Sequence, residues 1–485
     1  MVQPRLLSAV VCFLASVWLG ACSGLAESNP EAAALAPSDE PPAAPTLAPP
    51  ASATPAPTVP PTIAPDLLPT VPPTLVPTTA TTVAPTIQPV EINAGPAVAL
   101  TCPAPAASPG ASTNPRPANV VYNAEANTIQ VQAGEPTTLA AVAAALNQPE
   151  LLREIAPGEW LLGANLQIDP GAELTIAGPE VRRLKLRSEP AYYIWLKALG
   201  GNLNFSDTCV SSWDPTRAAL DSNPADGRSY VLARDGATMH IRNSMLHHLG
   251  YLADESYGVS YRLPGTGGEI VNSDLSYNYY GFYSFEVDGL VIRNNDVHHN
   301  VLYGIDPHTG SEQLLIEGNR VYANGKHGII LADACNNSII RSNSAYDNGE
   351  HGIVLYDDSN HNLVAGNVAY NNGLQGININ SAAHNVIRGN TTYANGSDGI
   401  GVGQQAADNL LEENMTYQNR AHGIHLYSEA RNTMISANIV ANNAEYGIYV
   451  KSPANHIGAG NRIYGNEVGH LPEHRGSAAD FDPAE

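Results

Sequence analysis

Cysteine and positively charged residues are scarce in this chain of 485 residues. Its five cysteines are too few for a scaffold held together by disulfides. There are 23 lysines and arginines against 46 aspartates and glutamates, and the formal charge at pH 7 is −23. This balance argues against a general binder of nucleic acids or anionic membranes, so we expect no nucleic-acid partner. A polyanionic substrate would need a local basic patch.

Three cysteines belong to the part of the chain that we expect to fold. Cys12 lies inside an apolar leader and Cys22 directly follows that leader, which leaves Cys102, Cys209 and Cys335. A Cys102–Cys209 bridge is compatible with an exported protein, although spacing alone does not establish the pairing. We expect Cys335 to be a small buried or turn residue rather than a nucleophile.

Residues 1–21 have the pattern of an export signal. Arg5 precedes an apolar run that is too short to cross a membrane as a helix. The string Leu-Gly-Ala-Cys that ends at Cys22 resembles a bacterial lipoprotein signal, which implies cleavage before Cys22 and a lipid on that residue. The alternative is an ordinary signal with a chance cysteine. We expect an exported protein at the outer face of the cell envelope, held to the membrane through this lipid alone.

Residues 22–117 consist largely of proline, alanine and threonine. A segment with so few aromatic and charged residues cannot bury a core, so we interpret it as a disordered linker. Folding is expected over 118–470, with a disordered tail at 471–485. Residues 136–155 are rich in alanine and leucine, with Thr137 or Thr138 as a candidate N-cap. They predict one or two short helices that cap the end of a repeat domain.

A glycine followed by an apolar residue recurs every 23 or 24 residues from Gly258 to Gly447. Within a repeat, residues such as Ile353 and Leu355 alternate toward one side, as in a short strand. Stacked strands of this kind predict an all-β fold, a right-handed parallel β-helix with about 23–24 residues per coil. Leucine-rich repeats are excluded because their Leu-x-x-Leu-x-Leu frame is absent. The glycines are Gly258, Gly281, Gly304, Gly328, Gly352, Gly376, Gly399, Gly423 and Gly447.

Two asparagine columns and one charged column keep the same period. We expect the asparagines to be scaffold, because asparagine tolerates left-handed turns and its side chains hydrogen-bond along a stack. The charged column predicts pairing between neighbouring coils at the surface. One asparagine column runs from Asn295 to Asn461, the second includes Asn324 to Asn443, and the charged column is Arg293, Glu317, Arg341, Ala365, Arg388 and Glu412.

One coil breaks the pattern. The second and fourth positions after each glycine point outward, and in the coil that starts at Gly304 they are Asp306 and His308 with Pro307 between them. Proline at an inward strand position removes a hydrogen-bond donor and replaces a core aliphatic residue. We therefore expect this coil to carry the chemistry.

Aromatic and imidazole side chains surround the irregular coil in the sequence. The residues that precede the glycines form a column which either stacks on sugar rings or only stabilises the sheet. The histidines nearby favour a catalytic site, and a metal bound by His298, His299 and His308 is the weaker alternative. We expect no metal and no cofactor. The predicted substrate-binding residues are Arg262, Tyr280, Tyr283, His327, His351, Tyr356 and Asn378.

The segments around this coil resemble the periplasmic mannuronan C5-epimerases of alginate biosynthesis. The resembling text is HHNVLYGIDPHTGSEQLLIEGN at 298–319 and KHGIIL at 326–331, and weaker likeness extends over about 159–427. Two departures stand out: Thr309-Gly310-Ser311 replaces the Asp-Arg-Ser common in that family, and Lys326 stands near an expected arginine.

The resemblance implies a β-helix enzyme that inverts C5 of a uronate in an anionic polysaccharide. We expect Lys326 to neutralise the substrate carboxylate, His299 or His308 to remove the C5 proton, and Tyr303 or a water to return one. Asp306 would orient or polarise a histidine. A polysaccharide lyase of the same fold and a non-catalytic carbohydrate-binding or structural β-helix are the alternatives, and we expect a monomer.

Overall fold

The computed structural model describes Cys102 and residues 118–471. The predicted leader, the lipidation site Cys22, the predicted linker apart from Cys102, and the tail beyond 471 lie outside the described residues. Within the described part, no helix is long and apolar enough to cross a membrane.

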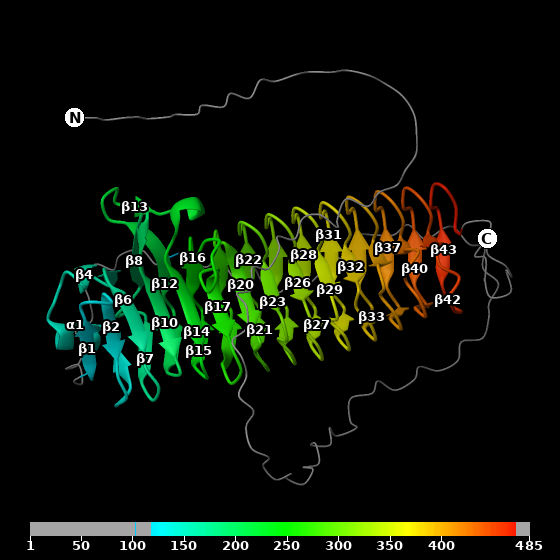
Figure 1. Cartoon of the computed structure of the whole chain (residues 1–485). Helices are drawn as coiled ribbons and strands as arrows, with labels where there is room; N and C mark the ends of the chain where they lie inside the picture. The colour runs from blue at the N-terminus through cyan, green and yellow to red at the C-terminus, as the bar shows by residue number, and fades with distance from the viewer. Residues whose placement is uncertain (1–101, 103–117, 472–485) are drawn as a thin grey trace, which may run out of the picture. The chain divides into compact units, whose positions relative to one another are not determined.

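The described residues form a solenoid of three sheets whose strands run almost entirely parallel (Figure 1). Each coil contributes one strand to each sheet, as the glycine period predicts. The antiparallel exceptions are β1 with β2, β4 with β5, β9 with β8 and β13 with β12, all in the N-terminal half. A short 3-10 helix, η2 (Pro224–Asp226), follows β13 (Ala219–Leu220), and β9 (Tyr192–Tyr193) follows β8.

Sheet A carries the glycine-led strands and has fourteen members in the described part. They are β1 (Val120–Asn123), β2 (Thr128–Val131), β6 (Asn165–Ile168), β10 (Trp195–Leu199), β14 (Tyr230–Arg234), β17 (Gly258–Arg262), β20 (Tyr280–Phe285), β23 (Ile305–His308), β26 (Ile329–Ala332), β29 (Ile353–Tyr356), β32 (Ile377–Asn380), β35 (Ile400–Gly403), β38 (Ile424–Leu426) and β41 (Ile448–Val450).

Sheet B follows sheet A in each coil. Its strands are β3 (Thr137–Thr138), β7 (Glu173–Ala177), β11 (Asn202–Ser206), β15 (Thr238–Arg242), β18 (Gly267–Val271), β21 (Val291–Arg293), β24 (Leu315–Glu317), β27 (Ile339–Arg341), β30 (Leu363–Ala365), β33 (Val386–Arg388), β36 (Leu410–Glu412), β39 (Met434–Ser436) and β42 (His456–Ile457).

Sheet C completes the coil before the chain returns to sheet A. Its strands are β4 (Leu152–Ala156), β5 (Glu159–Leu162), β8 (Arg183–Glu189), β12 (Cys209–Asp214), β16 (Met245–His247), β19 (Asp274–Ser276), β22 (Asp296–His298), β25 (Arg320–Tyr322), β28 (Ser344–Tyr346), β31 (Val368–Tyr370), β34 (Thr391–Tyr393), β37 (Met415–Tyr417), β40 (Ile439–Ala441) and β43 (Arg462–Tyr464), with β13 and β9 at its margin.

The predicted N-terminal cap is a single helix, α1 (Leu139–Leu146). The Thr138 hydroxyl accepts a hydrogen bond from the Ala141 amide, which satisfies one of the free donors at the helix start. Leu139 and Val142 join the interior core, so the helix covers apolar side chains at this end of the solenoid. No second helix follows: the last part of the predicted helical segment forms β4.

One continuous apolar core fills the interior, as the inward pairs predict. Ile353 and Leu355, for example, are fully buried together with their counterparts in neighbouring coils. Each inward aliphatic therefore contacts the equivalent residue of the next coil.

Both asparagine columns are buried hydrogen-bonded ladders. Asn367 is typical: its amide group donates to Ile340 O and to Asn390 Oδ1, while its own Oδ1 accepts from the backbone and side chain of Asn343. The expectation that these asparagines adopt the left-handed backbone is wrong. The residue before each one does so instead, for example Gly366 with φ 60°. The asparagines are selected for their side chains, which hydrogen-bond both backbone and neighbouring asparagine.

The charged column pairs between coils as predicted. Arg293 and Arg341 both contact Glu317, at 2.9 and 2.6 Å, and Arg388 contacts Glu412. Among the cysteines, Cys102 and Cys209 form a disulfide with their Cα atoms 5.6 Å apart, and Cys335 is free and buried.

The two kinds of ladder should differ strongly in their contribution to stability. Asn367→Ala leaves the Ile340 carbonyl and the Asn343 amide unpaired in the interior, so we expect a loss of about 2–4 kcal/mol. Arg341→Ala removes one exposed ion pair and should cost less than about 1 kcal/mol. Urea unfolding followed by circular dichroism measures both variants, and equal costs would contradict the scaffold role of the asparagines.

Candidate active site

The irregular coil places its acid and imidazole in the outward columns of sheet A, as predicted. Asp306 pairs in register with Tyr283, and His308 pairs with Phe285. Toward β26 the pairing is interrupted: Ile305 pairs with Ile329 and His308 pairs with Ala332, but the two residues between them have no partner in β26. The proline therefore opens the ladder on that side of β23.

Asp306 is 1% exposed, and neither carboxyl oxygen has a hydrogen-bond partner. Burial raises the pKa of this carboxyl well above its usual value. It lies near the phenols of Tyr280, Tyr283 and Tyr303, whose pKa values are raised first by their own burial and then by Asp306. The predicted role of orienting a histidine is wrong, since Asp306 makes no hydrogen bond. It is a buried carboxyl enclosed among tyrosines, with a raised pKa.

His308 is held by a short relay. Its Nδ1 lies 2.8 Å from the Thr309 hydroxyl, and that hydroxyl donates to Asp333 Oδ2 at 2.9 Å. Because the hydroxyl proton goes to Asp333, the hydroxyl accepts from His308, so Nδ1 carries the imidazole proton and Nε2 is left with its lone pair. Burial lowers the pKa of His308, and Asp333 partly opposes that effect. The imidazole is thus a neutral base with a defined tautomer.

Two basic side chains flank the coil along the axis. Arg262, two strands before His308, lies over the Tyr283 and Phe285 rings and pairs with Asp254 at 2.6 Å. Lys326, one coil later, lies 6.0 Å from the Tyr303 ring centre and 3.9 Å from Glu350. Each of these two cations is thus paired with a carboxylate of its own.

His299 does not join this group. It follows β22 at the end of sheet C, where its Nδ1 lies 2.8 Å from His298 Nδ1 and its ring stacks on Tyr277. His298 in turn contacts Asp274 at 3.1 Å and stacks on Tyr322. The prediction of His299 as a base beside His308 is therefore wrong. The alternative of a metal shared by His298, His299 and His308 is wrong for the same reason. Nearness in sequence did not reveal the turn that separates the end of sheet C from sheet A.

The aromatic column stacks on itself. Tyr280 and Tyr303 have ring centres 5.2 Å apart, Tyr303 and His327 5.2 Å, and His327 and His351 5.0 Å, with interplanar angles of 16–34°. Their faces cover one another, so the geometry favours the stabilising ladder over ring-face stacking on sugars. Burial lowers the pKa of His327 well below its usual value, and the nearby His351 and Lys326 add to the effect.

The remaining predicted binding residues lie on the same face. Tyr356 packs with Tyr303 against the outward Ile330 and Val354, which form a small apolar cluster separate from the core. Asn378 is buried and donates to Gln375 Oε1 at 3.3 Å. Along sheet A after His308, the outward positions are therefore first apolar, at Ile330 and Val354, and then carry an amide, at Asn378.

Thr309 and Asp333 were missed by reasoning from the sequence. Thr309 was noted only as a departure from the family pattern, one that removes a carboxylate beside the histidine. Asp333 lies 24 residues later, which is one repeat, so it stands beside Thr309 on the next coil. Aligning the repeats at the position after His308 would have found it.

Comparison with known proteins agrees with this architecture. The family model described as "Right handed beta helix region" matches residues 213–369 and 340–482, more than half of the chain, which confirms the predicted hand. The chain also resembles the mannuronan C5-epimerase of Pseudomonas aeruginosa, with 31% identity over 177 residues, 34% of this chain and 32% of that protein.

Mannuronan C5-epimerase AlgG of Azotobacter vinelandii is 29% identical over 175 residues, 33% of each chain. The match thus spans about a third of the length of these curated relatives. The crystal structure of the periplasmic alginate epimerase AlgG superposes with a TM-score of 0.64 at 25% identity, covering 71% of this chain and 85% of that one. The predicted resemblance to alginate epimerases is confirmed.

The buried carboxyl of Asp306 predicts how the stability of the protein depends on pH. The pKa of Asp306 is raised by folding, so the folded state holds the proton more tightly, and stability falls as pH rises above the unfolded pKa. Asp306→Asn removes this loss. We expect the melting temperature of the variant, relative to wild type, to rise by a few degrees between pH 4.5 and pH 8. A difference that does not change with pH would contradict a neutral buried acid.

Proposed function

The chain belongs to the right-handed β-helix family, and we propose that it uses the sheet A face around His308 to invert C5 of uronate residues in an anionic polysaccharide. The observation that carries the proposal is the base: an imidazole whose Nδ1 is fixed by Thr309, so that Nε2 is available for the C5 proton. The likeness to mannuronan C5-epimerases supports polymannuronate as the substrate to test first.

A C5 proton is acidic enough to remove only if the adjacent carboxylate is neutralised. Lys326 and Arg262 lie on the two sides of His308 and supply positive charge on this face. The raised pKa of Asp306 acts in the same direction, because it disfavours the ionised carboxylate that would repel an anionic substrate. The Lys326 ammonium would neutralise the sugar carboxylate as a point charge, without the paired hydrogen bonds of an arginine.

Inversion also needs an acid on the opposite side of the sugar ring. Tyr303 and Tyr283 are candidates, because burial raises the pKa of each phenol and keeps it protonated. Tyr356, which packs over the buried Ile330 and Val354, offers a surface for the apolar face of a pyranose. The proton leaves C5 to His308 Nε2, and a phenol proton, or a proton from water, is delivered to the other face.

We further propose that the protein acts outside the cytoplasm. The relative whose crystal structure superposes on this chain is described as periplasmic, and the leader at residues 1–21 supports export here. Lipid attachment at Cys22, the monomeric state and the absence of a nucleic-acid partner remain predictions from the sequence.

Polymannuronate incubated with the full chain in D₂O tests the activity directly. We expect deuterium at C5 and new guluronate signals in the proton NMR spectrum, because the removed proton is replaced from solvent. A lyase would instead produce unsaturated chain ends that absorb in the ultraviolet. Polymer binding with neither signal would leave a carbohydrate-binding protein and would overturn the proposed function.

Two histidine variants test the identity of the base. His308→Gln should lower kcat by about 10²–10⁴-fold, the contribution of a general base. His299→Gln is the matched control, because glutamine occupies the corresponding position five coils later at Gln418, with the same left-handed backbone. Unchanged turnover in His308→Gln, or an equal loss in His299→Gln, would contradict the assignment.

The relay makes a separate prediction. Thr309→Val removes the hydroxyl that fixes the His308 tautomer, so kcat should fall by about 10–100-fold and the acidic limb of its pH profile should shift. Thr309→Ser keeps the hydroxyl and should restore both. A loss in Thr309→Val without any change in the pH profile, or no rescue by serine, would show that the threonine only packs.

A further inference from the structure

We propose that sheet B is an interface through which two copies of this chain pack with their solenoid axes antiparallel. The interface is built on an aliphatic stripe, six side chains that occupy the first position of six consecutive strands. Each of them points outward, because the next residue in its strand is fully buried in the core. The members of the aliphatic stripe are Val291, Leu315, Ile339, Leu363, Val386 and Leu410.

The aliphatic stripe is continuous because the six strands pair in register. Each member is the pairing partner of the next, from Val291 with Leu315 to Val386 with Leu410. Five spacings of about 4.8 Å give a stripe about 24 Å long. The position before Val291 is Glu269, which bounds the stripe on one side. Figure 1 shows β21, β27 and β33 of this sheet following one another along one side of the solenoid.

The aliphatic stripe leaves apolar surface in contact with water. All six side chains are partly exposed, and Met434, which continues the column, is 38% exposed. Covering such surface is favourable by about 25 cal/mol for each Å² removed from water. A continuous apolar column with charged residues beside it has the layout of an interface, an apolar centre with a polar rim.

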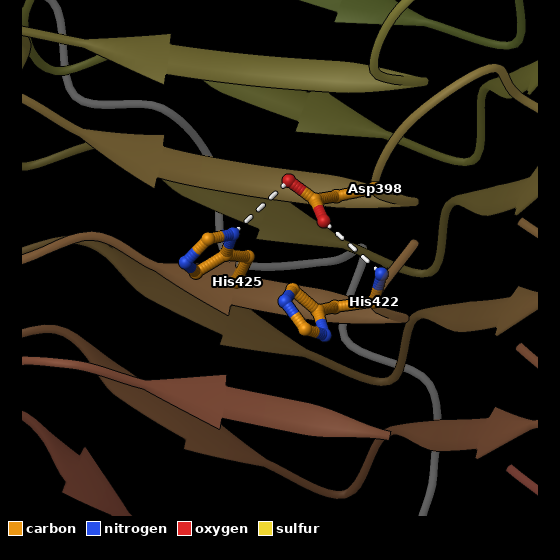
Figure 2. A group of neighbouring side chains, drawn as sticks. All are labelled: Asp398, His422 and His425. Carbon is orange, nitrogen blue, oxygen red and sulfur yellow. Dashed lines mark hydrogen bonds and ion pairs between the residues drawn. The ribbon is translucent and has the colours of Figure 1, made fainter. Parts of the chain in front are cut away.

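Outward side chains of the other two sheets are engaged with one another instead. On sheet A, the Asp398 carboxylate accepts hydrogen bonds from the His422 amide at 3.1 Å and from the Tyr427 hydroxyl at 2.9 Å. Figure 2 shows this carboxylate directed also toward the ring of His425, 3.3 Å away. On sheet C, tyrosines of successive coils stack face to face. The aliphatic stripe has no such polar or ring contacts to satisfy it, so sheet B is the face suited to a partner.

The charged column beside the aliphatic stripe indicates a second copy of this chain as the partner. Along the axis its order is arginine, glutamate, arginine, alanine, arginine, glutamate. When a second column runs in the opposite direction, no two like charges lie opposite one another, and the alanine leaves room for an arginine. In such a pair Arg293 lies opposite the partner's Glu412, Glu317 opposite the partner's Arg388, and Arg341 opposite the partner's Ala365.

A two-fold axis along the strand direction, between β27 and β30, produces this arrangement. It reverses the solenoid axis but keeps the strand direction, so the aliphatic stripe lies on itself and the charged column lies on itself. Ile339 then faces the partner's Leu363 at the centre. If the solenoid axes were parallel, the strand direction would be reversed, and the two columns could not both lie on themselves. Only the antiparallel dimer therefore buries the stripe and pairs the charges together.

The electrostatics of the chain suit an interface on this face. A formal charge of −23 makes two copies repel one another over most of their surface. The charged column holds three arginines and two glutamates, so it carries no net negative charge. The proposal departs from the monomer that we expected from the sequence, and the following experiments decide between the two.

Sedimentation equilibrium of the full chain tests the association. The aliphatic stripe is narrow, so we expect a weak, reversible dimer with a Kd of about 10–100 µM rather than an obligate one. The average mass should therefore rise from one chain toward two as the protein concentration increases through this range. His308→Gln should associate as wild type does, so the test is independent of the proposed epimerase activity.

Leu363→Lys tests the aliphatic stripe. In the dimer the added ammonium lies against the partner's Ile339, and the two-fold axis repeats this contact, so Kd should rise by at least about 10-fold. Ile439→Lys is the matched control, because Ile439 has the same first position in a strand of sheet C and is also partly exposed. The control should associate as wild type does. Thermal melting followed by circular dichroism verifies that both variants fold.

A charge exchange tests the antiparallel direction. Arg388→Glu places a carboxylate opposite the partner's Glu317, so Kd should rise by at least about 10-fold. Adding Glu317→Arg restores opposite charges between the two chains and should return Kd to within about threefold of wild type. Within one chain the double exchange instead places like charges on neighbouring strands, so only a contact with the partner can produce this recovery.

A wild type that remains a single chain throughout the concentration range would overturn the proposal, as would undiminished association of Leu363→Lys. Equal losses in Leu363→Lys and Ile439→Lys would show that added charge, and not the aliphatic stripe, controls association. A double exchange that associates more weakly than Arg388→Glu alone would exclude the antiparallel pairing.

Discussion

The strand register between neighbouring coils is the constraint on which the rest of the structure depends. Each ladder asparagine hydrogen-bonds both the backbone and the asparagine of the neighbouring coil, whether the coil between them has 23 or 24 residues. Differences in coil length are therefore absorbed in the turns, whereas a shift of strand register would break these buried bonds. The regular coils therefore hold the outward columns in line, and side chains one repeat apart become neighbours in space.

Within this frame, chemistry is found where a coil departs from its neighbours. Pro307 interrupts the pairing toward β26, and Asp306 is buried without a hydrogen-bond partner. Both features are unfavourable locally, and the stacked coils on either side stabilise the fold enough to keep them. Gly401 and Gly403 are a second departure, and the space they leave is where Gln375 and Tyr427 enclose Asp398.

The sequence predicted the fold almost completely, because the glycine period, the inward aliphatics and the asparagine columns all depend on one strand register. It also placed Asp306 and His308 on the correct face. His299 was misplaced, since nearness in sequence does not show that a turn lies between two sheets. The link from Thr309 to Asp333 and the meeting of Asp398 with His425 depend on side-chain rotamers, which no periodicity determines.

The disulfide between Cys102 and Cys209 has a mechanical consequence. It joins the chain at residue 102 covalently to β12, well inside the solenoid, whereas the backbone itself enters through β1 and the cap. Tension applied to the chain before Cys102 is therefore transmitted through the sulfur atoms to sheet C and bypasses α1 and the first coils. The terminal coils, which have a neighbour on one side only, are spared the load that would peel them away first.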